Sequence, residues 1–281
     1  MRIKFWGTRG SIPVPGRDTI EYGGNTTCLE ITLGGGKKLI VDAGTGIRAL
    51  GYELMKEGGA VDLYLLITHI HWDHIIGFPF FQPLYDPSTR IKIDGYPTCM
   101  RGLRSTFDTK MGDGFFPIKF DDLRAEVEYM DNISRGQMEL EDITIESIPL
   151  QHPQGGYGFR FREDGRTLVF ITDNELTREP WSGRSIRGYV EFCKEADILI
   201  HDAQYLPSEI KQRKGWGHSD YEAALMLAHE AGVKKLILFH HDPSRTDSDV
   251  AAIQETCQET ATQKNLSLTV EAAKENSELA L

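Results

Sequence analysis

The chain has 281 residues, 40% of them hydrophobic and 26% charged, and its formal net charge at pH 7 is −11. This composition excludes a disordered chain, the length allows a sizeable buried core, and the acidic balance disfavours a protein that coats nucleic acid. No apolar run approaches the roughly 18 residues of a membrane helix, and the start lacks the apolar stretch of a signal peptide, so we expect a cytoplasmic protein.

The first half of the chain predicts short strands with one helix among them. Runs rich in Ile, Leu, Val and Thr and bounded by glycine predict strands at residues 2–6, 26–33, 37–42 and 61–67. A helix is expected at residues 45–56. The stretch "GTGIRA" at 44–49 resembles a dinucleotide-binding turn, but Asp62, at the position of the required acid, begins the next strand instead of ending it. We therefore interpret this stretch as a tight turn between strand and helix.

The second half of the chain alternates strands and helices. Strands are expected at residues 143–149, 157–163, 167–172, 197–202, 235–240 and 266–271. Helices are expected at residues 185–195, 219–231 and 247–262. The 219–231 helix has the clearest ends, because Ser219 and Glu222 suit a capping box and Gly232 suits a helix stop. Residues 97–135 fit neither pattern, and we interpret them as an insertion or a lid near a site.

The stretch "THIHWDH" at residues 68–74 follows a buried strand and predicts a metal site. His69 and His71, two residues apart, point the same way from an extended backbone, while Asp73 and His74 can aim at a second point. This spacing suits two metal ions side by side better than one. Imidazole and carboxylate ligands suit Zn²⁺, with Mn²⁺ or Fe²⁺ as substitutes, and the scattered cysteines, which form no CxxC pair, argue against a thiolate site.

Three further polar residues occur at the ends of predicted strands. His152 follows the strand 143–149, Asp173 follows 167–172, and His240 ends 235–240. Separate strands that end at one edge of a sheet bring such side chains together, so we expect these residues to complete the metal site.

The motif T-H-x-H-x-D-H with Gly77, followed by a distant His, Asp and His in that order, resembles the metallo-β-lactamase superfamily. The likeness covers nearly the whole chain and implies a single domain over residues 1–281, an αββα sandwich with two metals between its sheets. By this resemblance His69, His71 and His152 hold one metal, Asp73, His74 and His240 hold the other, and Asp173 bridges them. His241 is the alternative to His240, although the alignment on the strand favours His240.

Two further stretches resemble the ribonuclease Z and phosphodiesterase branch of that superfamily. They are "FWGTRGSIPVPG" at the start and "GWGHSDYEAALMLAHEAGVKKLILFHHDP" near the end, and "DILIHDAQY" resembles a third element in which Asp202 replaces the usual glutamate. His218 precedes a predicted helix, and Asp202 can hold one of its ring nitrogens. A protonated His218 can then stabilise charge on a phosphoryl oxygen or protonate a leaving alkoxide.

The resulting hypothesis is a phosphodiesterase that uses two divalent metal ions and a hydroxide bridging them to hydrolyse small phosphodiesters, such as a cyclic nucleotide or a short nucleotide. Its catalytic residues are Asp73, Asp202 and His218. His218, Arg9 and Asn25 are its candidates for contacting substrate, and a surface salt bridge is an equal alternative for Arg9. His201 is expected beside the site or simply buried, and His229 on the solvent face of its helix.

Several alternatives share the metal ligands. Ribonuclease Z proper grips tRNA with a basic arm rich in glycine and proline that this chain does not match, so a long nucleic acid is not the expected partner. An RNA-processing endonuclease of that type nevertheless remains an alternative, as does a lactone, thioester or β-lactam hydrolase, which predicts no role for His218. A di-iron oxygen-reducing protein and a non-catalytic binding protein are weaker rivals. A homodimer is an expectation from the family alone.

Overall fold

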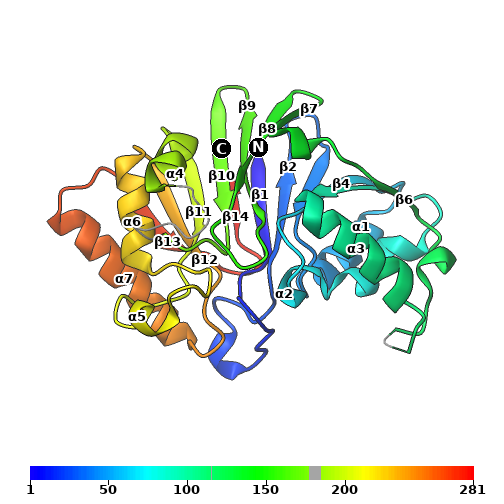
Figure 1. The fold of residues 1–281 in the computed structure, drawn as a ribbon, viewed down its shortest axis with the longest axis horizontal. Coiled ribbons are helices and arrows are strands. Elements are labelled where there is room, and N and C mark those ends of the chain that lie inside the picture. Colours follow the sequence, from blue (N-terminus) through cyan, green and yellow to red (C-terminus); the bar gives the residue numbers. More distant parts are fainter. Residues whose placement is uncertain (115, 177–184) are drawn as a thin grey trace.

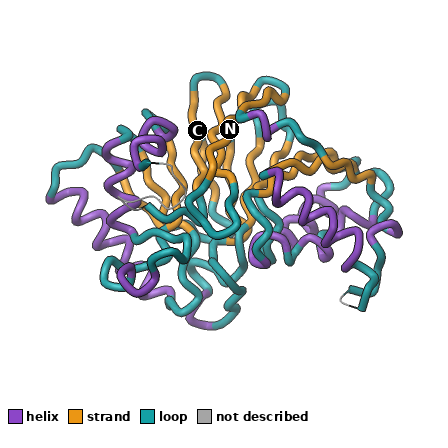
Figure 2. Tube along the Cα trace, viewed as in Figure 1, coloured by secondary structure: helices purple, strands orange, loops and turns teal. Residues whose placement is uncertain are grey.

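The computed structural model describes residues 1–114, 116–176 and 185–281, and these residues form two β-sheets that lie face to face. Helices cover the outer face of each sheet, as Figures 1 and 2 show. The expected αββα sandwich is therefore confirmed. Both chain termini lie on neighbouring strands in the middle of the molecule.

The first sheet has the strand order β14-β1-β2-β3-β4-β5-β6. Its pairs are antiparallel from β14 to β3 and parallel from β3 to β6. The strands are β1 (Arg2–Gly7), β2 (Cys28–Thr32), β3 (Lys38–Val41), β4 (Asp62–Ile67), β5 (Arg90–Gly95), β6 (Glu126–Tyr129) and β14 (Glu278–Ala280).

The second sheet has the strand order β13-β12-β11-β10-β9-β8-β7. Its pairs are parallel from β13 to β10 and antiparallel from β10 to β7. The strands are β7 (Gln137–Leu140), β8 (Ile143–Pro149), β9 (Tyr157–Glu163), β10 (Arg166–Ile171), β11 (Ile198–Asp202), β12 (Lys235–Phe239) and β13 (Thr269–Ala272). Because β10, β11 and β12 are parallel, the residues that follow them meet at one edge of the sheet.

The helices divide between the two sides of the sandwich (Figure 2). Their bounds are α1 (Ile47–Glu57), α2 (Trp72–Ile75), α3 (Pro97–Lys110), α4 (Ile186–Cys193), α5 (Ile210–Arg213), α6 (Tyr221–Glu230) and α7 (Asp247–Gln263). Short 3₁₀ turns occur at η1 (Arg17–Thr19), η2 (Phe78–Phe80), η3 (Gln82–Tyr85), η4 (Phe120–Asp122) and η5 (Ile133–Arg135).

Three apolar layers hold these elements together. One lies between the sheets and includes Phe5, Phe159 and Phe239, which are at most 1% exposed. A second lies between the first sheet and α1 and α3, and a third between the second sheet and α4, α6 and α7. Burial of these side chains is the main force that keeps the layers together. Within the described residues, no helix is long and apolar enough to cross a membrane.

The predicted strands and helices are present with ends shifted by a few residues, but two local predictions were wrong. Residues 97–135 are not irregular, because they contain α3 and the edge strand β6. The N-cap of α6 is Asp220, whose side chain accepts a hydrogen bond from Ala223 N at 2.9 Å. The hydroxyl of Ser219 instead donates to Asn174 O at 2.6 Å. The predicted stop is confirmed by Gly232, which has φ +67°.

Candidate metal centre

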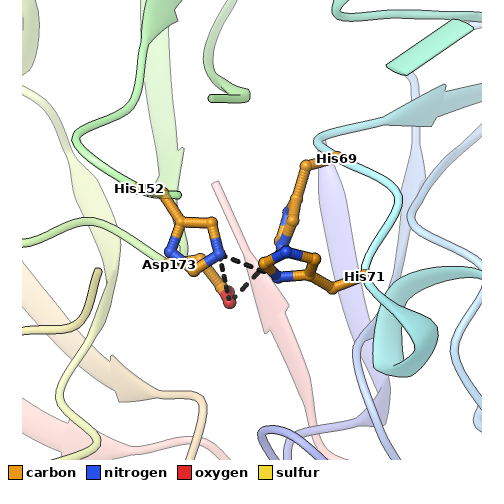
Figure 3. A group of neighbouring side chains, drawn as sticks. All are labelled: His69, His71, His152 and Asp173. Atoms are coloured by element: carbon orange, nitrogen blue, oxygen red, sulfur yellow. Dashed lines mark hydrogen bonds and ion pairs between the residues drawn. The ribbon is translucent and has the colours of Figure 1, made fainter. Parts of the chain in front are cut away.

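The site lies where loops from the two sheets meet. The first sheet supplies His69, His71, Asp73 and His74 from the segment after β4, and the second sheet supplies His152, Asp173 and His240 from the ends of β8, β10 and β12. Figure 3 shows His69 and His71 approaching from one side and His152 and Asp173 from the other. Every predicted metal ligand therefore lies in one cluster.

Close backbone contacts fix the segment after β4. Ala43 N donates to His74 O at 2.7 Å, and Gly77 N donates to Ala43 O at 2.9 Å. A Cβ atom at Gly77 would lie 2.1 Å from Gly44 O, and one at Gly44 would lie 2.3 Å from Asp73 O. Only glycine fits at either position, so the turn at 44–49 serves to seat the metal-binding segment and not a nucleotide phosphate.

The first group consists of His69, His71, His152 and Asp173, whose candidate ligand atoms lie within 4.8 Å of one another. Asp173 Oδ2 is 3.6 Å from His69 Nε2 and 3.8 Å from His152 Nε2. His152 Nε2 is in turn 2.9 Å from His71 Nδ1. One oxygen of Asp173 therefore faces this group.

The second group consists of Asp73, His74, His240 and Asp173, with the same 4.8 Å spread. Asp173 Oδ1 is 3.3 Å from His74 Nε2 and 3.2 Å from His240 Nε2. Asp73 Oδ2 is 3.3 Å from His74 Nε2 and 3.2 Å from His240 Nε2. The second oxygen of Asp173 thus faces this group, as expected of a carboxylate that bridges two ions.

The ring orientations of the histidines are set by oxygen partners on their outer nitrogens. Because a carbonyl oxygen can only accept, His152 Nδ1 donates to Gly217 O at 3.0 Å, which leaves Nε2 as a lone pair toward the group. His71 Nε2 pairs with Gln154 Oε1 at 2.9 Å and leaves Nδ1 for the group. Two lone pairs then face each other across 2.9 Å, an arrangement that repels without a cation.

The second group is oriented in the same way. His74 Nδ1 donates to Asp42 Oδ2 at 2.7 Å, and His240 Nδ1 donates to Gln204 Oε1 at 2.9 Å. Asp42 and Gln204 were not singled out in the sequence, although each stands at or just after the end of a strand, as the predicted ligands do. Asp42, Asp173 and His240 have positive φ values of 62°, 52° and 60°. Such backbone strain is typical of functional positions.

The N-terminal loop also reaches the second group. Ser11 N donates to Asp73 Oδ2 at 2.7 Å. A Cβ atom at Gly10 would lie 2.4 Å from His240 Nδ1, so the loop can approach that ring only with glycine there. The opening "FWGTRGS" therefore contributes backbone atoms to the site.

Two buried ring nitrogens test whether this site fits metal ions. His69 Nε2 and His74 Nε2 make no hydrogen bond to any described residue, although both rings are at most 1% exposed. Such atoms are costly to bury without a partner. Both are directed at carboxylate oxygens, and burial holds the pKa of His69 well below its usual range, which keeps its ring neutral. The donor set therefore fits two divalent cations, without indicating which metal.

Opposite charges on the histidines and aspartates of the two groups shift one another's pKa values. Burial alone would raise the pKa of Asp173, but His240, His74 and His69 outweigh it and hold that pKa well below the usual range. Burial alone would lower the pKa of His74, but Asp73, Asp173 and Asp42 outweigh it and raise that pKa well above the usual range. Both carboxylates that face His74 Nε2 are therefore ionised, and they favour a proton on that nitrogen in the metal-free protein, which a metal ion would replace.

His218 and Asp202 form a pair beside the metal ligands. His218 Nδ1 is 2.9 Å from Asp202 Oδ2 and 3.9 Å from Asp173 Oδ2. Its ring stacks on His240 with centroids 5.1 Å apart. The predicted pairing across the strand end is thus present in the structure, and the shorter aspartate reaches the histidine.

Arg9 and Asn25, the other candidates for substrate contact, are occupied by protein atoms. Arg9 is fully buried and donates to the carbonyl oxygens of Gly23, Asp242 and Arg245 at 2.7, 3.2 and 2.8 Å. Asn25 Nδ2 donates to Glu275 Oε2 at 3.0 Å, and its Oδ1 accepts from Thr45 Oγ1. Arg9 Nη2 also lies 4.0 Å from Asp247 Oδ1, so Arg9 does form an ion pair, although its own side chain is buried and not on the surface.

The remaining histidines lie outside the two metal groups. His241 Nε2 donates to Ala273 O at 2.9 Å, so the chain turns this ring away, and His240 is the residue in the second group. His201 is buried and pairs through Nδ1 with Asp202 O at 2.6 Å. His229 is exposed on α6, as predicted.

Comparison with known proteins identifies similar sequences and folds. Residues 37–241 match the sequence model of the family described as "Beta-lactamase superfamily domain". A ribonuclease Z of Haloferax volcanii is 22% identical, with 85% of this chain and 84% of that protein covered. A ribonuclease Z of Archaeoglobus fulgidus is 25% identical, with 85% and 86% covered.

Solved structures share the whole fold. The metallo-β-lactamase fold protein YhfI from Bacillus subtilis superposes with a TM-score of 0.73 at 17% identity, covering 99% of this chain and 98% of that one. The short form of human tRNase Z gives a TM-score of 0.68 at 22% identity, covering 100% and 99%. A diphosphatase of the PhnP family gives a TM-score of 0.68 at 18% identity, covering 100% and 97%.

Proposed function

The chain belongs to the metallo-β-lactamase superfamily, and from that premise we propose that it is a metal-dependent phosphodiesterase whose substrates are small phosphodiesters. The observation that carries this proposal is the His218–Asp202 pair, whose histidine Nδ1 lies 3.9 Å from the carboxylate shared by the two metal groups. A hydrolase acting on lactones or thioesters would share the metal ligands, so the His218–Asp202 pair is the feature on which the phosphodiesterase proposal depends.

The metal ligands proposed are His69, His71 and His152 for one ion and Asp73, His74 and His240 for the other, with Asp173 between them. When bound, two such ions, for which Zn²⁺ is the best match to the donor set, polarise phosphoryl oxygens and lower the pKa of a bound water. The outer partners Asp42, Gln154, Gly217 and Gln204 hold the rings in place.

His218 is the proton donor in this proposal. Burial alone would lower its pKa, but the carboxylate of Asp202 outweighs burial and raises the pKa of His218 to about 9. A raised pKa favours the protonated ring, in which Nδ1–H bonds to Asp202 and Nε2 carries the second proton. From that nitrogen His218 can neutralise charge on a phosphoryl oxygen and protonate the leaving alkoxide. Asp202 acts through His218 by fixing its orientation.

Charge and shape support a small substrate. The net charge of −11 opposes the binding of a long polyanion. Residues 97–135 carry six basic and seven acidic side chains, and their described part forms α3 and the edge strand β6. A compact, charge-balanced segment of this kind does not suit a tRNA-gripping arm. Cytoplasmic location and a homodimer remain expectations from the sequence and the family.

A second candidate is an RNA-processing endonuclease, because the similar proteins from Haloferax volcanii and Archaeoglobus fulgidus are ribonuclease Z. The two functions share the proposed metal and proton chemistry and differ in the size of the substrate. Binding of precursor tRNA at physiological salt therefore separates them.

The test is hydrolysis by the metal-loaded protein of bis-p-nitrophenyl phosphate, cyclic nucleotides, dinucleotides and precursor tRNA, beside a lactone and a thioester. Turnover of the small diesters that exceeds cleavage of precursor tRNA is expected. Efficient lactone or thioester turnover without phosphodiester cleavage would overturn the proposal. Specific cleavage of precursor tRNA with slow small-diester turnover would establish the second candidate.

A further inference from the structure

An apolar cavity of about 500 Å³ lies on the other side of α2 from the metal ligands. Its floor and walls come from α2, the η2 turn, α3 and the residues after α3. The principal lining residues are Trp72, Ile76, Phe80, Phe107, Met111 and Phe116. Phe80 and Phe116 meet edge to face, with ring centroids 5.3 Å apart. Lys110 and Thr106 supply the polar part of the lining.

The cavity and the metal site share one turn of helix. Asp73 and His74 are buried in the metal cluster, whereas Trp72, directly before Asp73, is 67% exposed and lines the cavity. Ile76 follows on the same exposed side. The peptide bond between Trp72 and Asp73 therefore joins the lining of the cavity directly to the cluster of candidate ligands.

Large apolar side chains that are exposed on the described surface cluster around this cavity. Among the described residues, the exposed large hydrophobic side chains are Ile12, Ile20, Tyr52, Trp72, Ile76, Phe80 and Trp216. Trp72, Ile76 and Phe80 gather at this single cavity, and Trp216 stands two residues before His218. Clustered exposed apolar side chains mark a binding surface, whereas scattered ones do not.

We propose that this cavity binds an aromatic group carried by the substrate, specifically the ester group that stays on phosphorus. The inference rests on the proposed phosphodiesterase function. A volume of about 500 Å³ lies within the range of small-ligand pockets, and flat rings suit stacking against a planar group such as a nucleobase.

The side of the substrate follows from the position of His218. This residue and its partner Asp202 lie on the second sheet's side of the site, beside Asp173 and His240, and the proposed function places the leaving group there. Trp72 belongs to the first sheet's side, on the segment after β4. The retained ester group is therefore the part of the substrate that points toward the cavity.

The test compares ethyl p-nitrophenyl phosphate with 2-phenylethyl p-nitrophenyl phosphate. Both release p-nitrophenolate when the bond between phosphorus and the aryl oxygen breaks, and only the alkyl ester retained on phosphorus differs. Base–aromatic stacking leads us to expect a kcat/KM at least about fivefold higher for the 2-phenylethyl diester in the wild-type protein. Trp72→Ala and Phe80→Ala should each reduce this preference. Tyr52→Ala, which removes an exposed aromatic ring from α1, should preserve it.

The measurements separate failure of the cavity from failure of the function. Equal kcat/KM for the two diesters, or a preference unchanged in Trp72→Ala and Phe80→Ala, overturns the cavity assignment while the phosphodiesterase stands. If the metal-loaded protein hydrolyses neither diester, the proposed function fails, and calorimetry with 2-phenylethyl phosphate against ethyl phosphate then tests the cavity directly. Equal affinity for those two ligands overturns it.

Two further measurements, of metal content and of oligomeric state, control for other effects of the substitutions. Metal content is measured for every variant, because substitution of Trp72 can disturb its neighbour Asp73. Phe80 is separated from the proposed ligands in the sequence, so its substitution is less prone to this effect. Light scattering is measured as well. If Phe80→Ala dissociates a dimer and leaves the substrate preference unchanged, the apolar wall is a contact between copies of the chain, and the proposal is wrong.

Discussion

His218 Nδ1 donates to Asp202 Oδ2 across 2.9 Å, between two side chains that are both at least 90% buried. Asp202 is itself held by the backbone, because its Oδ1 accepts from Gln204 N at 2.9 Å and its Oδ2 accepts from Asn174 N at 3.3 Å. The carboxylate therefore fixes both the tautomer and the direction of the histidine ring beside Asp173.

Removing the imidazole of His218 should impair chemistry while sparing metal binding. In His218→Ala we expect kcat for a small phosphodiester to fall roughly tenfold or more, the effect of losing one general acid. Metal content, measured by elemental analysis, should stay near the wild-type value. His229→Ala is the matched control, because that histidine is exposed on α6. Metal loss in His218→Ala would instead identify His218 as a ligand.

The role of Asp202 should depend on His218. Asp202→Asn removes the charge that favours the imidazolium, so kcat should fall, and the pH profile of kcat should move toward lower pH because protonation of His218 is no longer favoured. In a His218→Ala background the same substitution should have little further effect on kcat, which a double-mutant cycle measures. Additive losses of kcat in the cycle would show that Asp202 acts independently of His218.

Loss of a metal ligand should lower metal affinity more than loss of a residue that only orients a ligand. Asp173→Ala should halve or abolish bound metal, because both of its oxygens face metal groups. Asp42→Asn should weaken affinity by roughly 10- to 100-fold, because it loses the ionic hydrogen bond to His74 Nδ1. Competition with a chromogenic chelator measures both. Asp121→Asn, at an exposed aspartate, is the control, and wild-type affinity in Asp42→Asn would contradict an orienting role.

Arg9 should matter for folding. Arg9→Ala leaves three buried or partly buried carbonyl partners without their donor, and we expect a loss of about 3–5 kcal/mol in the free energy of unfolding, measured by urea titration. Arg17→Ala, at an exposed arginine in η1, should change it little. An Arg9→Lys variant with normal stability and a selectively raised KM would restore Arg9 as a substrate contact.

Asp197 should make stability depend on pH. Burial alone would raise its pKa, but hydrogen bonds from Lys234 Nζ at 2.7 Å and Thr167 N at 2.8 Å outweigh burial and lower the pKa in the folded state. A lowered carboxyl pKa stabilises the fold above the unfolded-state pKa of about 3.9, and this contribution disappears as pH falls through the folded-state pKa.

Asp197→Asn should therefore cost about 1–3 kcal/mol near neutral pH, measured by urea unfolding of the metal-free proteins. The difference between wild type and variant should hold to about pH 5 and shrink below about pH 4. A difference that stays constant at the lowest accessible pH would mean that the pKa of Asp197 is not lowered by folding.

The clustering of the proposed metal ligands was predictable from sequence because each follows a buried apolar strand, and parallel strands place their ends at one edge. Asp42 also follows a buried strand, but the sequence did not indicate its role. Its partner His74 lies 32 residues away, and the residues after Asp42 were interpreted as a tight turn. Gln154 and Gln204 orient histidines through neutral amides, and nothing in a single sequence distinguishes such amides from surface residues.

Other features depend on contacts that sequence patterns do not carry. The burial of Arg9 depends on carbonyl groups of Asp242 and Arg245, more than 230 residues away. The strands β6, β7 and β14 were missed because they are short edge strands with alternate side chains exposed, and β5, which lies between β4 and β6, was missed as well. The cap of α6 is one residue later than predicted because Asn174 O accepts the Ser219 hydroxyl. In each case tertiary structure overrides a local preference.

The division of the ligands between the sheets has a consequence for synthesis of the chain. The histidine-rich segment 69–74 is synthesised first, His152 and Asp173 follow, and His240 comes roughly 170 residues after the first histidine. At about 5–20 residues per second this interval lasts roughly 8–35 seconds, and only at its end are all the proposed ligands on the chain. The proposed two-metal site can therefore be completed only after most of the chain has been synthesised.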